Sequence, residues 1–377
     1  MSPTSYQTAP PRGVCPQSSN PPSVRTASPA TRRKISRSRP AGAATREDAR
    51  PWRDHLANAL SARAVDHVRV AVLDIGTNST RLLIADVDPT GRVAEIERHS
   101  AVTRLGEGVD TDGRLKQAAI DRVCGVLDGY AGHVRDRRCQ AARAVMTSAV
   151  RDAANGPDFV RLVGDRYEVD ARAITGAEEA RLTFRGAMSE RRPDPGQSTL
   201  VVDVGGGSTE LIIGAADEIS FHVSLQAGVV RQTERHLPAD PPTTTQLRAL
   251  RRDVRALIKR HVPSAERRRP TAAIAVAGTA TSCAAIDQGL RVYDSARVHG
   301  YPIDLTTARL LLARVAGVPL PARRTIRGLH PDRAPTIIAG IAILVEVLDS
   351  FELPGFEASE HDILRGAALE LSGVSPA

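Results

Sequence analysis

The chain has 377 residues, of which 41% are hydrophobic and 25% are charged, a composition typical of a globular protein with room for two domains. Aromatic residues make up only 3%, so a nucleic-acid platform of stacked aromatic rings is not expected. Residues 1–67 hold 11 Lys and Arg against 4 Asp and Glu, whereas the residues after 67 hold 40 Lys and Arg against 39 Asp and Glu. The net charge of +8 therefore belongs mainly to the N-terminal segment.

Residues 1–67 predict a disordered basic tail. The segment is rich in Pro, Ser, Ala and Arg and shows no hydrophobic periodicity before about Trp52. The run Arg32-Arg33-Lys34 could bind a polyanion such as nucleic acid or polyphosphate weakly, and a solvated extension without function is the alternative. For the rest of the chain, nucleic acid is not an expected partner.

The apolar runs and the cysteines indicate where in the cell the protein is expected. No stretch of about 18 apolar residues occurs, so we expect no membrane-spanning helix. The cysteines, Cys15, Cys124, Cys139 and Cys283, show no Cys-x-x-Cys spacing. We therefore expect a cytoplasmic protein with reduced thiols and no cysteine zinc site.

One short pattern occurs twice in the chain. The first copy is Asp74-Ile75-Gly76-Thr77-Asn78-Ser79-Thr80 and the second is Asp203-Val204-Gly205-Gly206-Gly207-Ser208-Thr209. Apolar runs flank each copy, which predicts two β-hairpins with Gly-rich turns. Such turns bring backbone N–H groups close to a ligand, and an Asp at the strand end can hold a cation. One copy could be an ordinary turn, but two copies favour a phosphate site bridged by a divalent metal.

The first hairpin, about 68–87, precedes several predicted elements. We expect a strand over 92–103, a polar loop at 104–108, an amphipathic helix from about 115 to 133, and a buried strand over 141–146 that turns at 147–151 into another helix. A strand over 169–174 then leads to Thr175 and Glu178, which have the spacing of a capping box at a helix start. Glu179 is left free for another role, although a carboxylate in a first helical turn is also favoured by the helix dipole alone.

The second half begins after a predicted linker at 191–197. A basic amphipathic helix is expected from after Pro242 to His261, and a strand over 274–281 that ends in a small-residue loop offers a third phosphate contact through Gly278 and Thr279. The apolar run 337–348 predicts a core helix. Ser359 and Asp362 have the spacing of a cap for the last helix, and His361 between them is expected to cap or pack rather than to bind metal.

Common nucleotide and hydrolase motifs are missing from the sequence. There is no Gly-x4-Gly-Lys-[Ser/Thr], Gly-x-Gly-x-x-Gly, His-Glu-x-x-His or Gly-x-Ser-x-Gly pattern. Phosphate binding is therefore expected to come from the paired hairpins.

Five motifs together carry a family resemblance. They are Asp74 to Ser79, Ala149 to Arg151 with Asn155, Ile174 to Ala180, Asp203 to Glu210, and Ser359 to Asp362. In this order they resemble the exopolyphosphatase/guanosine pentaphosphate phosphohydrolase (Ppx/GppA) family over about residues 68–373, in its short actinobacterial form. Sugar kinases and actin-like proteins share the two hairpins but not the Gly-x-Glu-Glu-Ala stretch. The resemblance implies an α/β fold with two actin-like, ribonuclease-H-type domains, 68–195 and 196–377, flanking a cleft.

The resemblance also implies a reaction and the residues for it. Family members use Mg²⁺ to cleave the terminal phosphate of inorganic polyphosphate or the 5′-phosphate of guanosine pentaphosphate, and they commonly form homodimers. Asp74 and Asp203 would hold Mg²⁺, and Glu179 would activate the attacking water, with Glu178 in reserve. The expected phosphate-binding residues are Gly76, Thr77, Asn78, Ser79, Arg104, Arg151, Gly205, Gly206, Gly207, Ser208, Thr209, Glu210, Gly278 and Thr279.

One departure from the family pattern leaves alternatives open. Some relatives carry a second catalytic glutamate where this chain has Ser148, so catalysis would rest on Glu179 alone. A polyphosphate- or nucleotide-binding sensor without activity is therefore one alternative. The other is an ATP-dependent small-molecule kinase of the same fold, which the Gly-x-Glu-Glu-Ala stretch disfavours.

Overall fold

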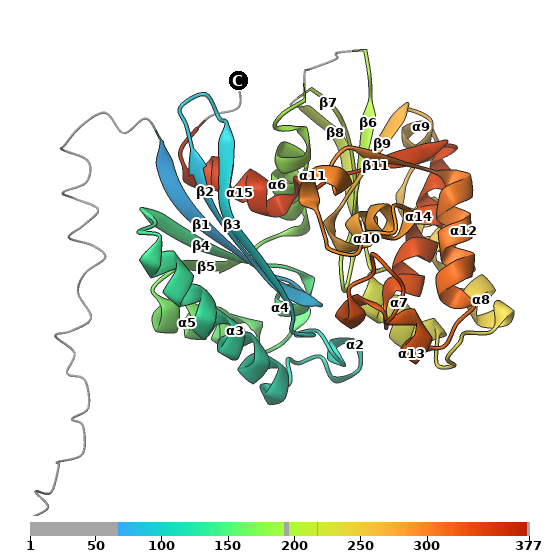
Figure 1. Ribbon diagram of the computed structural model, residues 1–377, viewed down its shortest axis with the longest axis horizontal. Helices are drawn as coiled ribbons and strands as arrows, with labels where there is room; N and C mark the ends of the chain where they lie inside the picture. Colours follow the sequence, from blue (N-terminus) through green and yellow to red (C-terminus); the bar gives the residue numbers. More distant parts are fainter. Residues whose placement is uncertain (1–66, 192–195, 217, 375–377) are drawn as a thin grey trace, which may run out of the picture. The chain divides into compact units, whose positions relative to one another are not determined.

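The computed structural model describes residues 67–191, 196–216 and 218–374 (Figure 1). The predicted tail, apart from His67, lies outside the described residues, as do Cys15 and the centre of the predicted linker. The described residues contain two β-sheets, one formed before the linker and one after it.

The first sheet has the strand order β3-β2-β1-β4-β5. Strands β1 to β3 pair antiparallel, and β4 and β5 run parallel to β1. Residues 70–73 of β1 are buried on both faces, as expected for the apolar run of a central strand. The elements are β1 (Val68–Ile75), β2 (Ser79–Val87), β3 (Val93–Val102), α2 (Val109–Asp112), α3 (Gln117–Asp136), β4 (Ala141–Met146), α4 (Ser148–Asp152), α5 (Gly156–Tyr167), β5 (Asp170–Ala173) and α6 (Gly176–Met188).

The second sheet repeats this topology with one strand added. Its order is β10-β11-β9-β6-β7-β8, so β8-β7-β6-β9-β11 corresponds to the whole first sheet and β10 forms an antiparallel edge. The elements are β6 (Thr199–Val204), β7 (Thr209–Ala215), β8 (Glu218–Leu225), α7 (Val229–His236), α8 (Thr244–His261), α9 (Ser264–Arg267), β9 (Ala272–Val276), α10 (Ala277–Asp287), α11 (Ser295–Val298), β10 (Tyr301–Asp304), α12 (Leu305–Ala316), α13 (Leu320–Arg323), η1 (Pro331–Arg333), α14 (Ile337–Phe351), β11 (Gly355–Ala358) and α15 (Ile363–Leu371). This duplication agrees with the predicted α/β fold built from two related halves.

Two helices lie between the sheets. Helix α15 packs on one face of the first sheet, and α6 packs on the facing side of the second (Figure 1). The two helices touch through glycines, because a Cβ on Gly366 would lie 1.9 Å from the Leu182 carbonyl oxygen and one on Gly186 would lie 1.9 Å from that of Asp362. The last helix therefore returns to the first sheet, and the proposed boundary between 195 and 196 stays a prediction.

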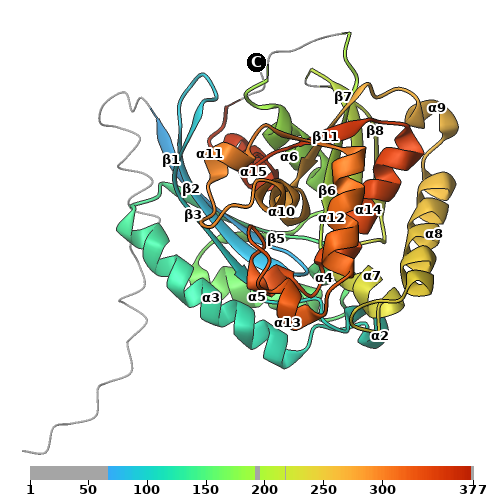
Figure 2. The same cartoon turned by 45° about the vertical axis from the view of Figure 1, so that its right-hand side comes forward.

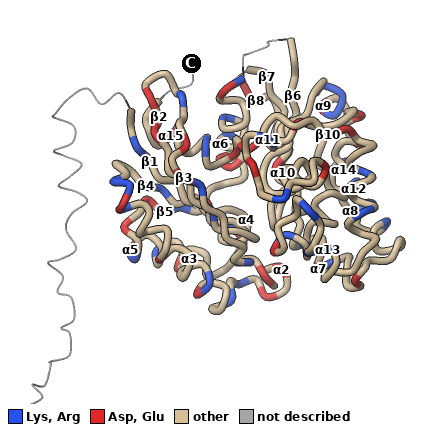
Figure 3. Tube along the Cα trace, viewed as in Figure 1, with Lys and Arg blue, Asp and Glu red and all other residues tan. Residues whose placement is uncertain are grey.

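The outer faces of the sheets carry the remaining long helices. Figure 2 shows α3 and α5 beside the first sheet and α8, α12 and α14 beside the second. The nearly all-apolar α14 is buried along its length and forms the centre of the larger core, as its sequence predicted. Basic and acidic residues are interspersed over both halves (Figure 3), in line with their near-equal numbers after residue 67.

The predicted end of the 274–281 strand is wrong. Strand β9 stops at Val276, and the small residues that follow form helix α10 rather than a loop. Ala277 has a φ of 61° and turns the chain directly from strand to helix. Because α10 is buried almost throughout, it lacks the polar face that would have distinguished it from a strand.

The predicted cap of the last helix is also wrong in part. The N-cap of α15 is Asp362, whose carboxylate accepts from the Leu364 N–H at 3.0 Å. The Ser359 hydroxyl instead accepts from the His361 N–H at 3.0 Å, in the turn before the helix. His361 packs against His299 with ring centroids 4.1 Å apart, which agrees with the expected packing role. Cys124, Cys139 and Cys283 are buried free thiols.

Candidate active site

The two hairpin turns have the same internal geometry and meet each other. In the first, the Gly76 N–H donates to the Ser79 carbonyl at 2.9 Å, and in the second Gly205 donates to Ser208 at 3.0 Å. A Cβ on Gly206 would lie 2.7 Å from the Thr77 Cβ and 2.8 Å from the Asn78 nitrogen, so only glycine fits there. The repeated sequence thus forms two matching turns whose backbones approach closely.

A cavity of about 80 Å³ lies where the turns meet, which is room for several water-sized groups. Its walls come from both sheets, from α4, from the first turns of α6 and α10, and from the segment before α14. The lining includes Asp74, Gly76, Thr77, Asn78, Ser79, Arg81, Thr147, Ser148, Glu179, Asp203, Gly205, Gly206, Ser208, Gly278, Thr279 and Arg333.

Three buried carboxylates line this cavity. Asp74 lies at the end of β1, Asp203 at the end of β6, and Glu179 in the first turn of α6. Burial raises the pKa of Asp74, and it raises that of Asp203 to about 7 despite the nearby Arg81 guanidinium. Burial and the neighbouring Glu210 also raise the pKa of Glu179 well above its usual value. A cation bound among these carboxylates would therefore favour their ionised forms against the effect of burial.

Arg81 is the cation nearest the two aspartates. Its Nε donates to Asp74 Oδ2 at 2.8 Å, and its Nη1 pairs with Asp362. Burial would raise the pKa of Asp362, but Arg81 and Arg98 lower it overall. The other oxygen of Asp74, Oδ1, is buried and has no hydrogen-bond partner among the described residues. Asp74 thus has one oxygen free to accept a further cation.

The neighbouring glutamates Glu178 and Glu179 have different surroundings. Glu178 completes the predicted capping box, since its N–H donates to Thr175 Oγ1 at 3.2 Å and its carboxylate accepts from the Thr175 N–H at 3.4 Å. Glu179 is buried, and its Oε2 accepts from Arg151 at 3.0 Å. Only Glu179 of this pair lines the cavity.

Most of the predicted site residues come together, and the exceptions have clear positions. Arg151 binds Glu179, and Arg104 lies on the surface with a φ of 50°. Glu210 accepts from the Ser224 hydroxyl at 2.8 Å behind the turn, and burial and Asp203 raise its pKa to about 7. Thr209 donates to the Ala227 carbonyl at 2.7 Å. Gly207 borders a smaller cavity beside the first.

Arg81 and Arg333 were missed from the sequence. The Arg333 guanidinium is half-buried and makes no hydrogen bond or ion pair with any described residue. It lies against Gly278, where a Cβ would be 1.1 Å from Nη1. A second cavity of about 740 Å³ shares Arg81, Gly278 and Arg333 with the first and adds Arg98 and Arg291. Arg333 reaches the cavities only through the tertiary fold, so no local pattern marks it. Arg81 lies directly opposite Asp74 in the first hairpin, so the register of that hairpin is the signal that could have found it.

Ser148 occupies the position discussed for a second glutamate. Its hydroxyl lies 2.9 Å from Thr77 Oγ1, and it lines the cavity. Among the described helices, none combines the length and the apolar character that crossing a membrane requires.

Comparisons with known proteins agree with this architecture. A sequence model of the Ppx/GppA phosphatase family matches residues 83–368. Exopolyphosphatase 2 of Mycobacterium tuberculosis is 37% identical over 318 residues, which cover 81% of this chain and 99% of that protein.

Two solved structures extend the likeness to the fold. The crystal structure of an exopolyphosphatase from Cytophaga hutchinsonii is 26% identical with a TM-score of 0.74, covering 82% of this chain and 99% of that one. A family member from Aquifex aeolicus is 28% identical with a TM-score of 0.69, covering 81% and 97%. The chain therefore belongs to the Ppx/GppA phosphatase family.

Proposed function

We propose that this protein is an exopolyphosphatase, which releases orthophosphate from the end of inorganic polyphosphate. The observation that carries the proposal is the single cavity lined by both Gly-rich turns and by Asp74, Asp203 and Glu179. Family membership and the similarity to exopolyphosphatase 2 of Mycobacterium tuberculosis support the choice of substrate.

A Mg²⁺ ion fits the donor set of the cavity. Asp74 Oδ1 lacks a partner among the described residues, and Asp203 is a second buried carboxylate that lines the same cavity. Carboxylate oxygens are ligands that Mg²⁺ accepts. Asp74 and Asp203 would hold the ion, which when bound would offset the negative charge of the phosphate groups.

Residues of the cavity would bind the terminal phosphate and activate the attacking water. The backbone N–H groups and hydroxyls of the two turns hold the terminal phosphate, with Arg333 as an additional cation. Glu179 accepts a proton from water as the water oxygen bonds to the terminal phosphorus. The bond from that phosphorus to its bridging oxygen breaks, and the products are orthophosphate and a chain one unit shorter. Arg151 would favour the ionised form of Glu179 against the effect of burial and would orient its carboxylate.

The larger cavity would take the rest of the chain. It adjoins the first, and Arg98, Arg291 and Arg333 contribute positive charge to its lining. Guanidinium groups suit phosphate oxygens, although Asp332, Glu360 and Asp362 also contribute to the lining. Guanosine pentaphosphate is a further substrate to be tested, and a homodimer remains a prediction from the family.

Ser148 keeps one alternative open. A serine lies in the cavity where some relatives are expected to have a glutamate, so binding without hydrolysis is the competing function. A kinase would pass the phosphate to an acceptor rather than to water.

A substrate panel tests the proposal. The protein is incubated with short and long polyphosphate, guanosine pentaphosphate and ATP, with Mg²⁺ or with excess chelator, and free phosphate is measured. We expect Mg²⁺-dependent release from polyphosphate. Tight polyphosphate binding without release would favour the sensor, and phosphate found only on an added acceptor would favour the kinase.

A further inference from the structure

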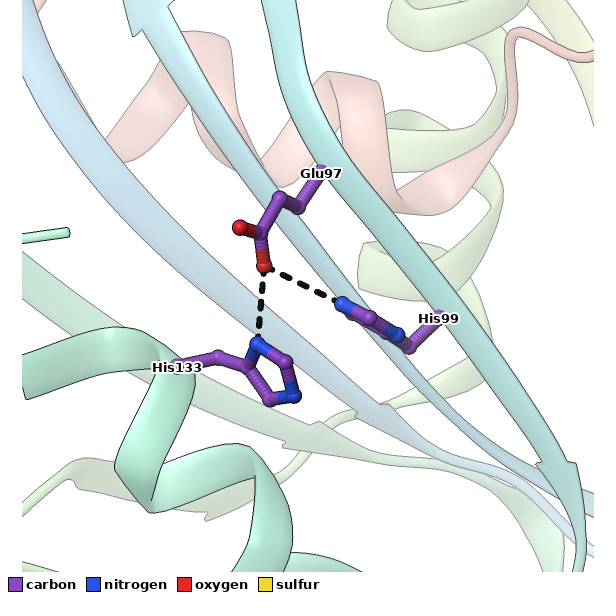
Figure 4. A group of neighbouring side chains, drawn as sticks. All are labelled: Glu97, His99 and His133. Atoms are coloured by element: carbon purple, nitrogen blue, oxygen red, sulfur yellow. Dashed lines mark hydrogen bonds and ion pairs between the residues drawn. The ribbon is translucent and has the colours of Figure 1, made fainter. Parts of the chain in front are cut away.

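A second group of metal-ligating side chains lies outside the active-site cavity. It consists of Glu97 and His99 on β3 and His133 on α3 (Figure 4). Glu97 and His99 are two residues apart on a strand, so both side chains point to the same face of the sheet. His133 reaches them from the helix that covers that face.

The two imidazoles converge on a single carboxylate oxygen. His99 Nε2 lies 3.1 Å from Glu97 Oε2, and His133 Nδ1 lies 2.9 Å from the same atom. The ring centroids of the two histidines are 4.3 Å apart. Each residue offers one ligand atom, and all three atoms lie within 4.8 Å of one another.

The other oxygen of Glu97 is held separately. Arg137, one helical turn after His133, pairs with Oε1. Arg137 therefore orients the carboxylate while Oε2 stays directed at the histidines. Metal-ligating carboxylates commonly have such a supporting hydrogen bond on the oxygen that does not bind the metal.

We propose that Glu97, His99 and His133 form a binding site for a zinc-type divalent cation. Two histidines and one carboxylate with a fourth position for water are a known zinc ligand set. At Zn–N and Zn–O distances of about 2.0–2.2 Å, tetrahedral ligand atoms lie roughly 3.3 Å apart. The two histidine nitrogens lie at similar distances, 3.1 Å and 2.9 Å, from Glu97 Oε2. The imidazole ligands favour Zn²⁺ over Mg²⁺, which prefers oxygen. The ion would link β3 to α3.

Zinc titration calorimetry tests the site. It is done with a large excess of Mg²⁺, which competes with Zn²⁺ for the carboxylates of the active site but binds imidazole poorly. The variants are His133→Ala and Glu97→Gln. The matched control is His67→Ala, because the side chain of His67 is 47% exposed, against 44% for His133, and its Nε2 also faces a carboxylate, at 3.4 Å from Asp86.

We expect the wild type and His67→Ala to bind one equivalent of Zn²⁺. His133→Ala and Glu97→Gln should bind Zn²⁺ at least about tenfold more weakly. Zn²⁺ should also raise the melting temperature of the first two proteins but not of the last two. Far-UV circular dichroism checks that each variant folds. Zinc affinity unchanged in either His133→Ala or Glu97→Gln, or no zinc binding by the wild type, would overturn the proposal.

Discussion

At the scale of single residues, the difference between Glu178 and Glu179 follows from helix geometry. Successive residues of an α-helix point about 100° apart, so two adjacent glutamates in one turn meet different surroundings. Glu178 turns back to the N-cap, and Glu179 points to the cavity wall where Arg151 binds it. The first carboxylate stabilises the helix start, and the second is available for chemistry.

The pH dependence of activity should change when the hydrogen bond from Arg151 to Glu179 is removed. The pKa of Glu179 is raised by burial and lowered by Arg151, and a base works only when deprotonated. Activity should therefore rise with pH through a pKa above the usual glutamate range. In Arg151→Gln that pKa should rise further, so the acidic limb of the pH–rate profile should move to higher pH. A limb that stays in place or moves to lower pH would contradict this contact, and the exposed Arg252→Gln is the control.

Arg333 should contribute mainly to substrate binding. Its guanidinium is free of protein partners among the described residues and borders both cavities. Losing a charged hydrogen bond to phosphate costs about 1.5–3 kcal/mol, so Arg333→Ala should raise KM for polyphosphate about 10-fold to 150-fold. Arg252→Ala, which removes an exposed arginine outside both cavities, should change KM little. Equal KM values for the two variants would rule out the role proposed for Arg333.

At the scale of elements, the contact between α6 and α15 depends on glycine. A Cβ on Gly366 would lie 1.9 Å from the Leu182 carbonyl oxygen, so the helices must separate to admit it. Gly366→Ala should destabilise the fold by about 1–3 kcal/mol, although alanine is the better helix former. Gly129→Ala on α3, where nothing lies within 4 Å, should instead stabilise by about 0.5–1 kcal/mol. Urea denaturation compares them, and the same sign for both would contradict the packing.

The elements that could be predicted are those with a local cause. The hairpins were predicted because apolar strands and Gly-rich turns alternate within a short stretch, and the start of α6 because a capping box is local. Helix α10 was missed because a small-residue helix buried on all sides resembles a buried strand in sequence. Arg333 and the pairing of His99 with His133 depend on contacts between residues far apart in the chain, which no spacing rule reveals. Arg81 could have been found, because the register of the first hairpin places it opposite Asp74.

At the scale of the whole molecule, the two halves of the chain contact each other, and the last helix, α15, contributes to the core of the first sheet. The core of the first sheet includes Leu364 and Ala367 of α15. Between the halves, Arg231 Nη1 lies 2.8 Å from Asp110 Oδ1. The last element of the chain, α15, therefore packs against the first sheet, which is formed by the first strands of the chain.

A fragment of residues 68–195 should consequently fail to fold cooperatively, because it exposes the apolar face that α15 covers. Joining residues 355–377 to it through a flexible linker should restore cooperative unfolding by urea. The same fusion with the α15 residues in scrambled order is the control. Cooperative unfolding of 68–195 alone would contradict this account and support a fully independent first domain.

The most direct test of the catalytic assignment compares Glu179→Gln with Glu178→Gln in Mg²⁺-dependent phosphate release from polyphosphate. Both changes remove one charge from the same helical turn, and glutamine can still complete the capping box at 178. We predict that Glu179→Gln lowers kcat by about 100-fold or more while still binding polyphosphate, and that Glu178→Gln stays near the wild-type rate. Equal rates for the two variants, or a greater loss in Glu178→Gln, would contradict the role of Glu179 as the base.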